Sequence, residues 1–155
     1  MDEATLVEVA DEELEGMRTV RLRIPARAEY VALARLALSG LADIAALPAE
    51  LVADLKLALT EAVSNSVRHA YREGGGFVSV AYELSRDALA IEVVDDGEGF
   101  DPERPPALEG EELTEGGLGI AIIRTIADGF ELQSQPGVRG SRLRFVKRLQ
   151  RSATA

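Results

Sequence analysis

The sequence contains no cysteine and only one histidine, His69, among its 155 residues. Without cysteine the chain cannot form a disulfide, a thiolate zinc site or a cysteine nucleophile. With a single histidine it cannot build a metal site that needs two imidazole ligands. Disulfide-stapled domains, thiolate metal centres and thiol catalysis are therefore excluded.

Long apolar runs are also lacking. The longest apolar region, residues 31–47, is interrupted by Arg35, Ser39, Gly40 and Asp43. A membrane-spanning helix needs about 20 predominantly apolar residues, so this region does not predict a membrane span. The first four residues lack the basic and then apolar order of a secretory signal. We therefore expect a cytoplasmic protein that does not associate with membranes.

Basic residues are fewer than acidic ones, 17 against 27, which gives a formal net charge of −10. The acidic residues are concentrated in residues 2–15 and 95–115. Direct nucleic-acid binding is not expected, because phosphate contacts require a basic face. An acidic surface suits a basic protein partner, or it only keeps the protein soluble. Charge alone does not separate these two interpretations.

Hydrophobic residues make up 46% of the chain, which is enough to form the core of one domain. We expect this domain to cover residues 17–149. An acidic, flexible tail is expected at residues 1–16, and a short C-terminal tail at residues 150–155.

Apolar periodicity predicts the order of the elements. Alternation predicts strands at 19–24, 78–84, 89–93, 130–133 and 143–146. Helical spacing predicts helices at 30–38, 49–70 and 118–127, with Gly40 and Gly129 ending the first and the third. Residues 95–119 are predicted to form a long functional or mobile loop. This order favours an α+β fold with a mixed or antiparallel sheet and helices on one face.

The second predicted helix carries Glu61, Asn65 and His69, each four residues after the last. Because an α-helix has 3.6 residues per turn, the three side chains share one stripe. This stripe borders the apolar stripe, so a helix packed on a core would turn it toward a cleft. An ordinary polar helix edge is the alternative interpretation.

Asp95 has the same parity as the alternating core aliphatics of the strand at 89–93. A carboxylate on the buried side is costly unless a group donates hydrogen bonds to it, and the exocyclic amine of a purine would be a suitable donor. If the strand ends earlier, the side chain turns to solvent instead. Gly97 and Gly99 follow, and they let the backbone pass close to a flat ligand.

A glycine-rich segment, residues 115–120, is predicted to open the third helix. Backbone N–H groups at a helix start form an anion site, and glycine lets phosphate oxygens approach them. The segment is not a P-loop because the P-loop lysine is absent. It is not a Rossmann fingerprint either, because it follows a loop and not a strand.

Together these segments resemble the three sequence boxes of the GHKL ATPase superfamily, in the family's order. The boxes are Glu61-x-x-x-Asn65-x-x-x-His69, Asp95-x-Gly97-x-Gly99 and Gly116-Gly117-Leu118-Gly119. Residues 65–71 and 115–120 are similar to the anti-sigma-factor serine kinase branch. The resemblance covers about residues 18–148. It implies the Bergerat fold, a two-layer α/β sandwich with a mixed, mostly antiparallel sheet and helices on one face.

The resemblance also implies ATP and Mg²⁺ as cofactors. Asn65 would hold the Mg²⁺ that bridges the phosphates, and Asp95 would accept a hydrogen bond from the adenine amine. Gly97 and Gly99 would shape the adenine pocket, and residues 101–117 would form a lid. Further nucleotide contacts are assigned to Arg68, His69, Gly116, Gly117, Leu118, Gly119 and Ser141. For His69, a structural role is an equal alternative.

Glu61 has the place of the family's catalytic carboxylate, which would orient or deprotonate a serine hydroxyl. The resemblance therefore favours a serine kinase that phosphorylates an anti-anti-sigma protein and sequesters a sigma factor. One alternative is a detached histidine-kinase catalytic domain, which needs a phosphorylatable histidine outside the nucleotide helix. Another is a non-catalytic ATP-binding module that sequesters a partner, which would not need Glu61. A homodimer is left open.

Overall fold

The computed structural model describes residues 6–12, 16–71, 76–98, 110–134 and 139–149. Their strands form one sheet in the order β1-β2-β3-β4-β6-β5, and every neighbouring pair is antiparallel. The strands are β1 (Leu6–Glu12), β2 (Met17–Pro25), β3 (Phe77–Leu84), β4 (Ala88–Glu98), β5 (Gly129–Gln133) and β6 (Arg139–Arg148). The helices are α1 (Val31–Ala45), α2 (Ala49–Tyr71) and α3 (Gly110–Ile126), with the short 3-10 helix η2 (Ala28–Tyr30) before α1.

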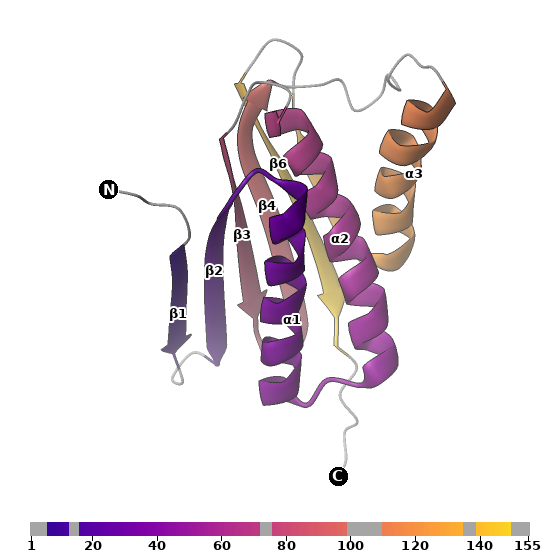
Figure 1. Cartoon of the computed structure of the whole chain (residues 1–155). Coiled ribbons are helices and arrows are strands. Elements are labelled where there is room, and N and C mark those ends of the chain that lie inside the picture. Colours follow the sequence, from indigo (N-terminus) through magenta and orange to yellow (C-terminus); the bar gives the residue numbers. More distant parts are fainter. Residues whose placement is uncertain (1–5, 13–15, 72–75, 99–109, 135–138, 150–155) are drawn as a thin grey trace.

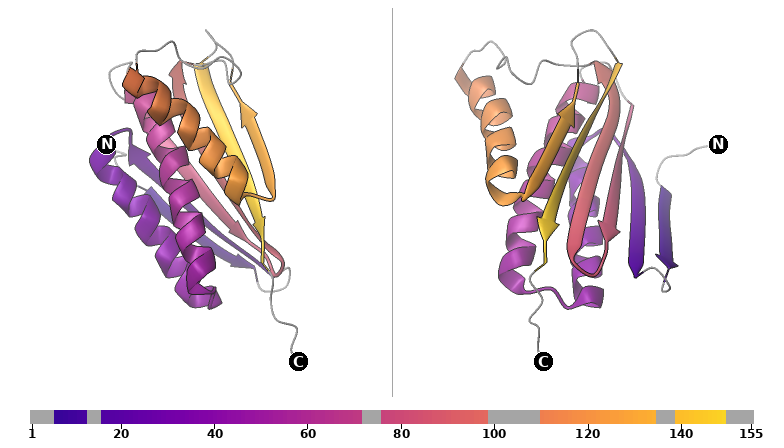
Figure 2. Two further views of the ribbon diagram at one scale, coloured as in Figure 1. Left: turned by 90° about the vertical axis from the view of Figure 1, so that its right-hand side faces the viewer. Right: turned by 180° about the vertical axis from the view of Figure 1, so that it is seen from behind.

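The three long helices cover the same face of the sheet, so the molecule has two layers (Figure 1, Figure 2). Successive side chains of a strand point to opposite faces, and β3 alternates between buried and more exposed positions accordingly. The core lies between the layers; its largest fully buried members include Tyr82, Phe145, Leu38, Leu55 and Ile123. The predicted α+β fold with helices on one face is confirmed, and the sheet, expected to be mixed or antiparallel, is antiparallel throughout the described residues.

Tyr82 links the sheet to the first helix. Its hydroxyl donates a hydrogen bond of 2.8 Å to the backbone carbonyl of Ala34 in α1. Burial raises the pKa of Tyr82 well above its usual value, so the hydroxyl keeps its proton and remains a donor throughout the physiological pH range.

None of the helices that the structure describes is long and apolar enough to cross a membrane.

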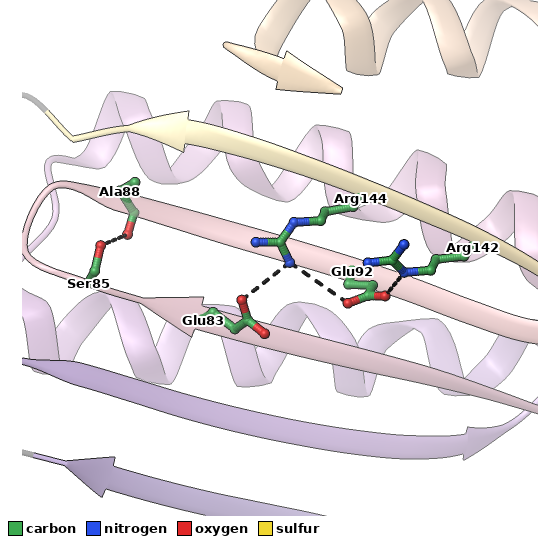
Figure 3. A network of polar contacts seen from close by, with 6 residues as sticks. All are labelled: Glu83, Ser85, Ala88, Glu92, Arg142 and Arg144. Carbon is green, nitrogen blue, oxygen red and sulfur yellow. Dashed lines mark hydrogen bonds and ion pairs between the residues drawn. The ribbon is translucent and has the colours of Figure 1, made fainter. Parts of the chain in front are cut away.

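The opposite face of the sheet carries charged side chains (Figure 3). Arg144 Nη1 lies 3.2 Å from Glu83 Oε1 and 3.8 Å from Glu92 Oε1. Arg142 also pairs with Glu92, which raises the pKa of Arg142. Ion pairs this close to solvent contribute little to stability, because water screens the charges. Their arrangement across β3, β4 and β6 nevertheless agrees with the observed register, which places Glu92 opposite Arg144.

A tight hairpin turn at residues 85–87 joins β3 to β4. The backbone N–H of Ser85 donates to the carbonyl of Ala88 at 2.9 Å, and the Ser85 hydroxyl donates to the same oxygen at 3.2 Å (Figure 3). The two donors of Ser85 share the carbonyl oxygen of Ala88 as their acceptor, and these bonds close the turn. This turn fixes the register that carries β4 along β3 as far as Asp95.

The N-terminal segment differs from the flexible tail expected at residues 1–16. Within it, β1 pairs with β2, with Val7 opposite Leu22 and Val9 opposite Val20. The side chains of Val7 and Val9 are 58% and 70% exposed. Backbone pairing, rather than burial in the core, therefore holds this strand.

The expected domain limits of 17–149 and the expected tail at 150–155 stay predictions, and residues 150–155 lie outside the described part of the chain.

The first helix does not end at Gly40 as predicted. It continues to Ala45, and Ala46 ends it in the left-handed conformation, with φ of 55°. Leu41 and Ala42 are buried beyond the glycine. Burying a leucine stabilises by about 1.5–3 kcal/mol, more than the roughly 1 kcal/mol that a helical glycine costs, so the apolar stripe carries the helix onward.

The predicted loop at 95–119 is also shorter at both ends. Strand β4 runs to Glu98, and α3 begins at Gly110 instead of residue 118. The early part of α3 reads GEELTEGG, in which glutamates at a helix start are favoured by the helix dipole. The apolar periodicity that would reveal these first turns of the helix is missing from the segment, which explains the wrong prediction.

Candidate functional site

The buried polar side chains of the described residues lie toward one end of the sheet. Four such residues are buried, namely Asn65, Ser66, Asp95 and Ser141. The last turns of α2, the end of β4 and the start of β6 meet at this end (Figure 1). A buried polar group is costly without partners, so polar groups concentrated at one end of an otherwise apolar core indicate a site.

Asp95 lies on the helix-covered face of the sheet, as its parity predicts. It is 4% exposed, and the register places it between Val78 of β3 and Ser141 of β6. The Ser141 hydroxyl donates a hydrogen bond of 2.6 Å to Asp95 Oδ2, the short distance typical of a bond to a charged acceptor. Because β4 continues to Glu98, the alternative in which Asp95 turns to solvent is wrong.

The strand pairing becomes irregular just beyond Asp95. The register of β4 against β6 shifts between the pairs Asp95–Ser141 and Glu98–Arg139, as in a β-bulge. Opposite this irregularity Gly140 has φ of +94°, and a Cβ there would lie 3.4 Å from the backbone oxygen of Asp95. Glycine suits both the backbone conformation and the close approach. Bulges occur often beside functional sites, where they redirect a side chain.

Removing the Ser141 hydroxyl tests this pair. Ser141→Ala will lower the free energy of unfolding by about 1–3 kcal/mol, because a buried carboxylate loses a donor. Urea unfolding followed by circular dichroism measures the change. Ser141→Thr keeps a hydroxyl and should lose less. Equal losses in both variants would mean that packing, and not the hydrogen bond, matters at this position.

Glu61 and Gly119 bring the second and third helices into close contact. Glu61 is partly buried on α2, and Gly119 is buried on α3. A Cβ built on Gly119 would lie only 2.6 Å from Glu61 Oε1. The Glu61 carboxylate therefore occupies the space that a side chain at position 119 would need. Asn65, one turn further along α2, is 8% exposed, so Glu61 and Asn65 both lie on the inner side of the helix, as the shared stripe predicts.

The remaining predicted residues are placed less completely. Arg68 is partly buried on α2. Leu118 is 53% exposed on α3. Gly97 belongs to β4, and His69 belongs to α2, although its side chain lies outside the described part. Gly99 and residues 101–109 of the expected lid also lie outside the described residues.

Gly116 and Gly117 do not open a helix, contrary to the prediction. Both lie inside α3, which starts at Gly110. Backbone N–H groups in a helix interior bond to carbonyls of the preceding turn, so they do not form the free donor cluster of a helix start. An anion site built only on the start of a helix is therefore not found at these two glycines.

Ser66 was not predicted as a site residue, yet it is 4% exposed. The sequence carries one signal for it. A serine occupies a position within the apolar stripe of the second helix, where aliphatic side chains are expected. A polar residue at such a position is a stronger indication of a functional site than a polar residue on the polar edge of the helix.

Comparison with known proteins assigns the chain to one family. The sequence profile of the family described as "Histidine kinase-like ATPase domain" matches residues 24–147. The serine-protein kinase RsbW of Staphylococcus aureus is 36% identical over 141 residues, which cover 84% of this chain and 89% of that protein. The protein of the same name from strain JH9 is 35% identical with the same coverage.

Among solved structures, the histidine kinase domain of the blue-light activated histidine kinase EL346 from Erythrobacter litoralis matches with a TM-score of 0.48 and 18% sequence identity. The match covers 79% of this chain and 61% of that one. The assignment depends on the family profile and on the sequence relatives, both of which span most of the chain. This chain belongs to the histidine kinase-like ATPase family and, within it, is a relative of the RsbW serine-protein kinases.

Proposed function

We propose that this protein is an ATP-dependent serine kinase that phosphorylates an anti-anti-sigma protein and sequesters a sigma factor. The observation that carries the proposal is the buried pair of Asp95 and Ser141, joined by a 2.6 Å hydrogen bond on the inner face of the sheet. Family membership supports the same function, because the relatives are named serine-protein kinases.

The Asp95 carboxylate suits a purine that carries an exocyclic amine. An ionised carboxylate only accepts hydrogen bonds, and its two oxygens have about four acceptor sites. Ser141 uses one of these sites at Oδ2. An adenine amine is a donor of matching polarity. ATP as the nucleotide follows from the family, and the adenine contact to Asp95 is our proposal.

Asn65 suits a magnesium ion that is held mainly by phosphates and water. Its side-chain amide supplies one neutral oxygen, and the residue is buried in the last third of α2, whose end lies beside the end of β4 (Figure 1). Mg²⁺ prefers oxygen ligands and is usually bound through few protein groups together with substrate phosphates. When bound, it would neutralise charge on the phosphates during transfer. Contacts from Arg68, His69, Gly97, Gly99, Gly116, Gly117 and Leu118 are proposed on the resemblance of the sequence boxes alone.

Glu61 is the proposed catalytic residue. Its carboxylate lies between α2 and α3, where it would orient the serine hydroxyl of the substrate and accept its proton. A module that only sequesters a partner has no use for a carboxylate at this place. A histidine kinase would need a phosphorylatable histidine, and the chain has only His69, which belongs to α2 itself.

A basic surface on at least one partner would complement the formal net charge of −10, although this charge also serves solubility. The resemblance indicates the kinds of partner, a sigma factor and an anti-anti-sigma protein, but not which individual proteins they are. A cytoplasmic location is part of the proposal, and homodimerisation stays a prediction.

Two measurements on the wild-type chain test the proposed function. Calorimetric titration with ATP and Mg²⁺ should show binding in the micromolar range. Transfer of the γ-phosphate from labelled ATP to the anti-anti-sigma protein of the same organism should require the serine of that protein, so its serine-to-alanine variant is the control. A folded chain that binds ATP without transfer would support the sequestering module instead. A folded chain that does not bind ATP would contradict the nucleotide site altogether.

A further inference from the structure

Gly119 makes an unusually close contact for a helical glycine. A Cβ built on it would lie 2.6 Å from Oε1, 3.6 Å from Cδ and 3.7 Å from Cβ of Glu61. The Glu61 side chain therefore lies along the α3 backbone at this position, with its carboxylate nearest. A separation of 2.6 Å between a carbon and an oxygen is well inside van der Waals contact, so a side chain at position 119 and the present position of the carboxylate exclude each other.

Two other glycines provide the comparison. Gly40 lies inside α1, and a Cβ there would meet nothing within 4 Å. Gly129, at the start of β5, would place a Cβ 3.8 Å from the Val146 Cβ, an ordinary contact. Among these three, only Gly119 faces a charged side chain in the space that its own side chain would fill. Glycine is the poorest helix former after proline, so a buried glycine inside a helix calls for a reason in its surroundings.

We propose that Gly119 is a positioning residue for Glu61. The missing side chain leaves the space in which the carboxylate lies, and the α3 backbone limits where its oxygens can move. This inference rests on the proposed function, in which Glu61 acts on the serine hydroxyl. It gives Gly119 a role that differs from the phosphate contact implied by its place in the glycine-rich box.

A methyl group at position 119 would displace the carboxylate rather than unfold the protein. Oε1 is at the end of a flexible side chain, so it can swing away at little cost to the fold. The oxygen would have to retreat by about 0.5–1 Å to reach ordinary contact distance. Misplacement of a catalytic group by about 1 Å can lower a reaction rate by about 10²-fold.

Gly119→Ala tests the role in catalysis. We expect kcat for serine phosphorylation to fall by about 10- to 100-fold, with the KM and the dissociation constant for ATP changed by less than about twofold. Gly40→Ala is the matched control, since it makes the same substitution in a helix where the added methyl meets open space; its kcat should equal that of the wild type. If Gly119→Ala instead weakens ATP binding and preserves kcat, the positioning role is wrong and a phosphate contact is favoured.

A second measurement tests the contact without any kinase assay. Alanine in place of a helical glycine should raise the melting temperature by about 2–4 °C where space is open, as at Gly40. At Gly119 we expect this gain to be smaller in the wild type and to appear in full when Glu61 is also replaced by alanine. Equal shifts in the two backgrounds would overturn the proposal. An inactive wild-type chain would contradict the proposed function, whereas this thermal comparison would still decide whether Glu61 and Gly119 are coupled.

Discussion

Glu61→Gln will lower the rate of serine phosphorylation by about 10²- to 10⁴-fold and leave ATP affinity within about twofold of the wild type. A general base typically contributes a factor of this size, and a glutamine amide does not accept the proton of a hydroxyl. Glutamine has nearly the same shape as glutamate. It therefore still fits in the space beside Gly119, where Glu61 Oε1 now lies, so the fold and the nucleotide site should be preserved.

Single-turnover transfer of labelled phosphate measures this loss directly, and calorimetry on the same preparation measures ATP affinity. Glu50→Gln is the matched control, because Glu50 lies exposed in the first turn of the same helix. It should phosphorylate at the wild-type rate. A Glu61→Gln variant with wild-type activity would show that another group orients the hydroxyl, and Glu61 would lose its assigned role.

Asp95→Asn will weaken ATP binding in the presence of Mg²⁺ by about 10- to 100-fold. A hydrogen bond to a charged group contributes about 1.5–3 kcal/mol, and each 1.4 kcal/mol corresponds to a factor of ten in affinity. The carboxylate accepts from Ser141 at Oδ2 and would accept from the adenine amine. In asparagine an NH₂ group replaces one of the two carboxylate oxygens. This group is itself a donor, and it would have to face either the Ser141 hydroxyl or the adenine amine, which are donors as well.

Asp96→Asn is the control for this change. Asp96 is the next residue of the same strand and is exposed, so the substitution removes one negative charge without entering the site. Calorimetry should give wild-type affinity for this variant. Equal weakening by both substitutions would mean that net charge, and not the contact at Asp95, governs ATP binding. Unfolding of Asp95→Asn in urea should be recorded as well, to show that the variant is folded at the temperature of the titration.

The long second helix and the alternating strands could be predicted because each has a strong and sustained period. The predicted helix at 49–70 corresponds to α2, Ala49–Tyr71. The predicted strands at 78–84 and 89–93 lie within β3 and β4. In these segments the residues that are buried follow the period of the element itself, so the sequence pattern and the packing carry the same information.

Two of the errors have a common physical cause. Val7 and Val9 alternate along β1, but their side chains are largely exposed, so backbone pairing with β2 decides the structure and leaves only a faint sequence pattern. Local preference predicts a helix end at Gly40, but the buried Leu41 continues the helix. In each case a tertiary contact outweighs the local preference of the residue.

Only part of the candidate site could be predicted from the sequence, for a similar reason. The inward direction of Asp95 follows from strand parity alone. Its contact with Ser141 depends on the pairing of β4 with β6, and only the family resemblance assigns Ser141 to the site. The contact between Glu61 and Gly119 depends on how closely two helices approach, and no spacing within either helix encodes that distance.

The pairing of β4 with β6 also bears on how the chain folds. Asp95 and Ser141 are 46 residues apart in sequence, whereas β3 and β4 are joined by a tight turn. Closing a longer loop costs more chain entropy, and contacts between distant segments slow folding. A molecule that has formed only its β3–β4 hairpin does not yet have Ser141 beside Asp95. A ligand that requires this pair binds only the completed fold, and at 100 times its dissociation constant it stabilises that fold by about 2.7 kcal/mol. A nucleotide bound at this pair would therefore protect the completed fold against partial unfolding and the proteolysis that follows it.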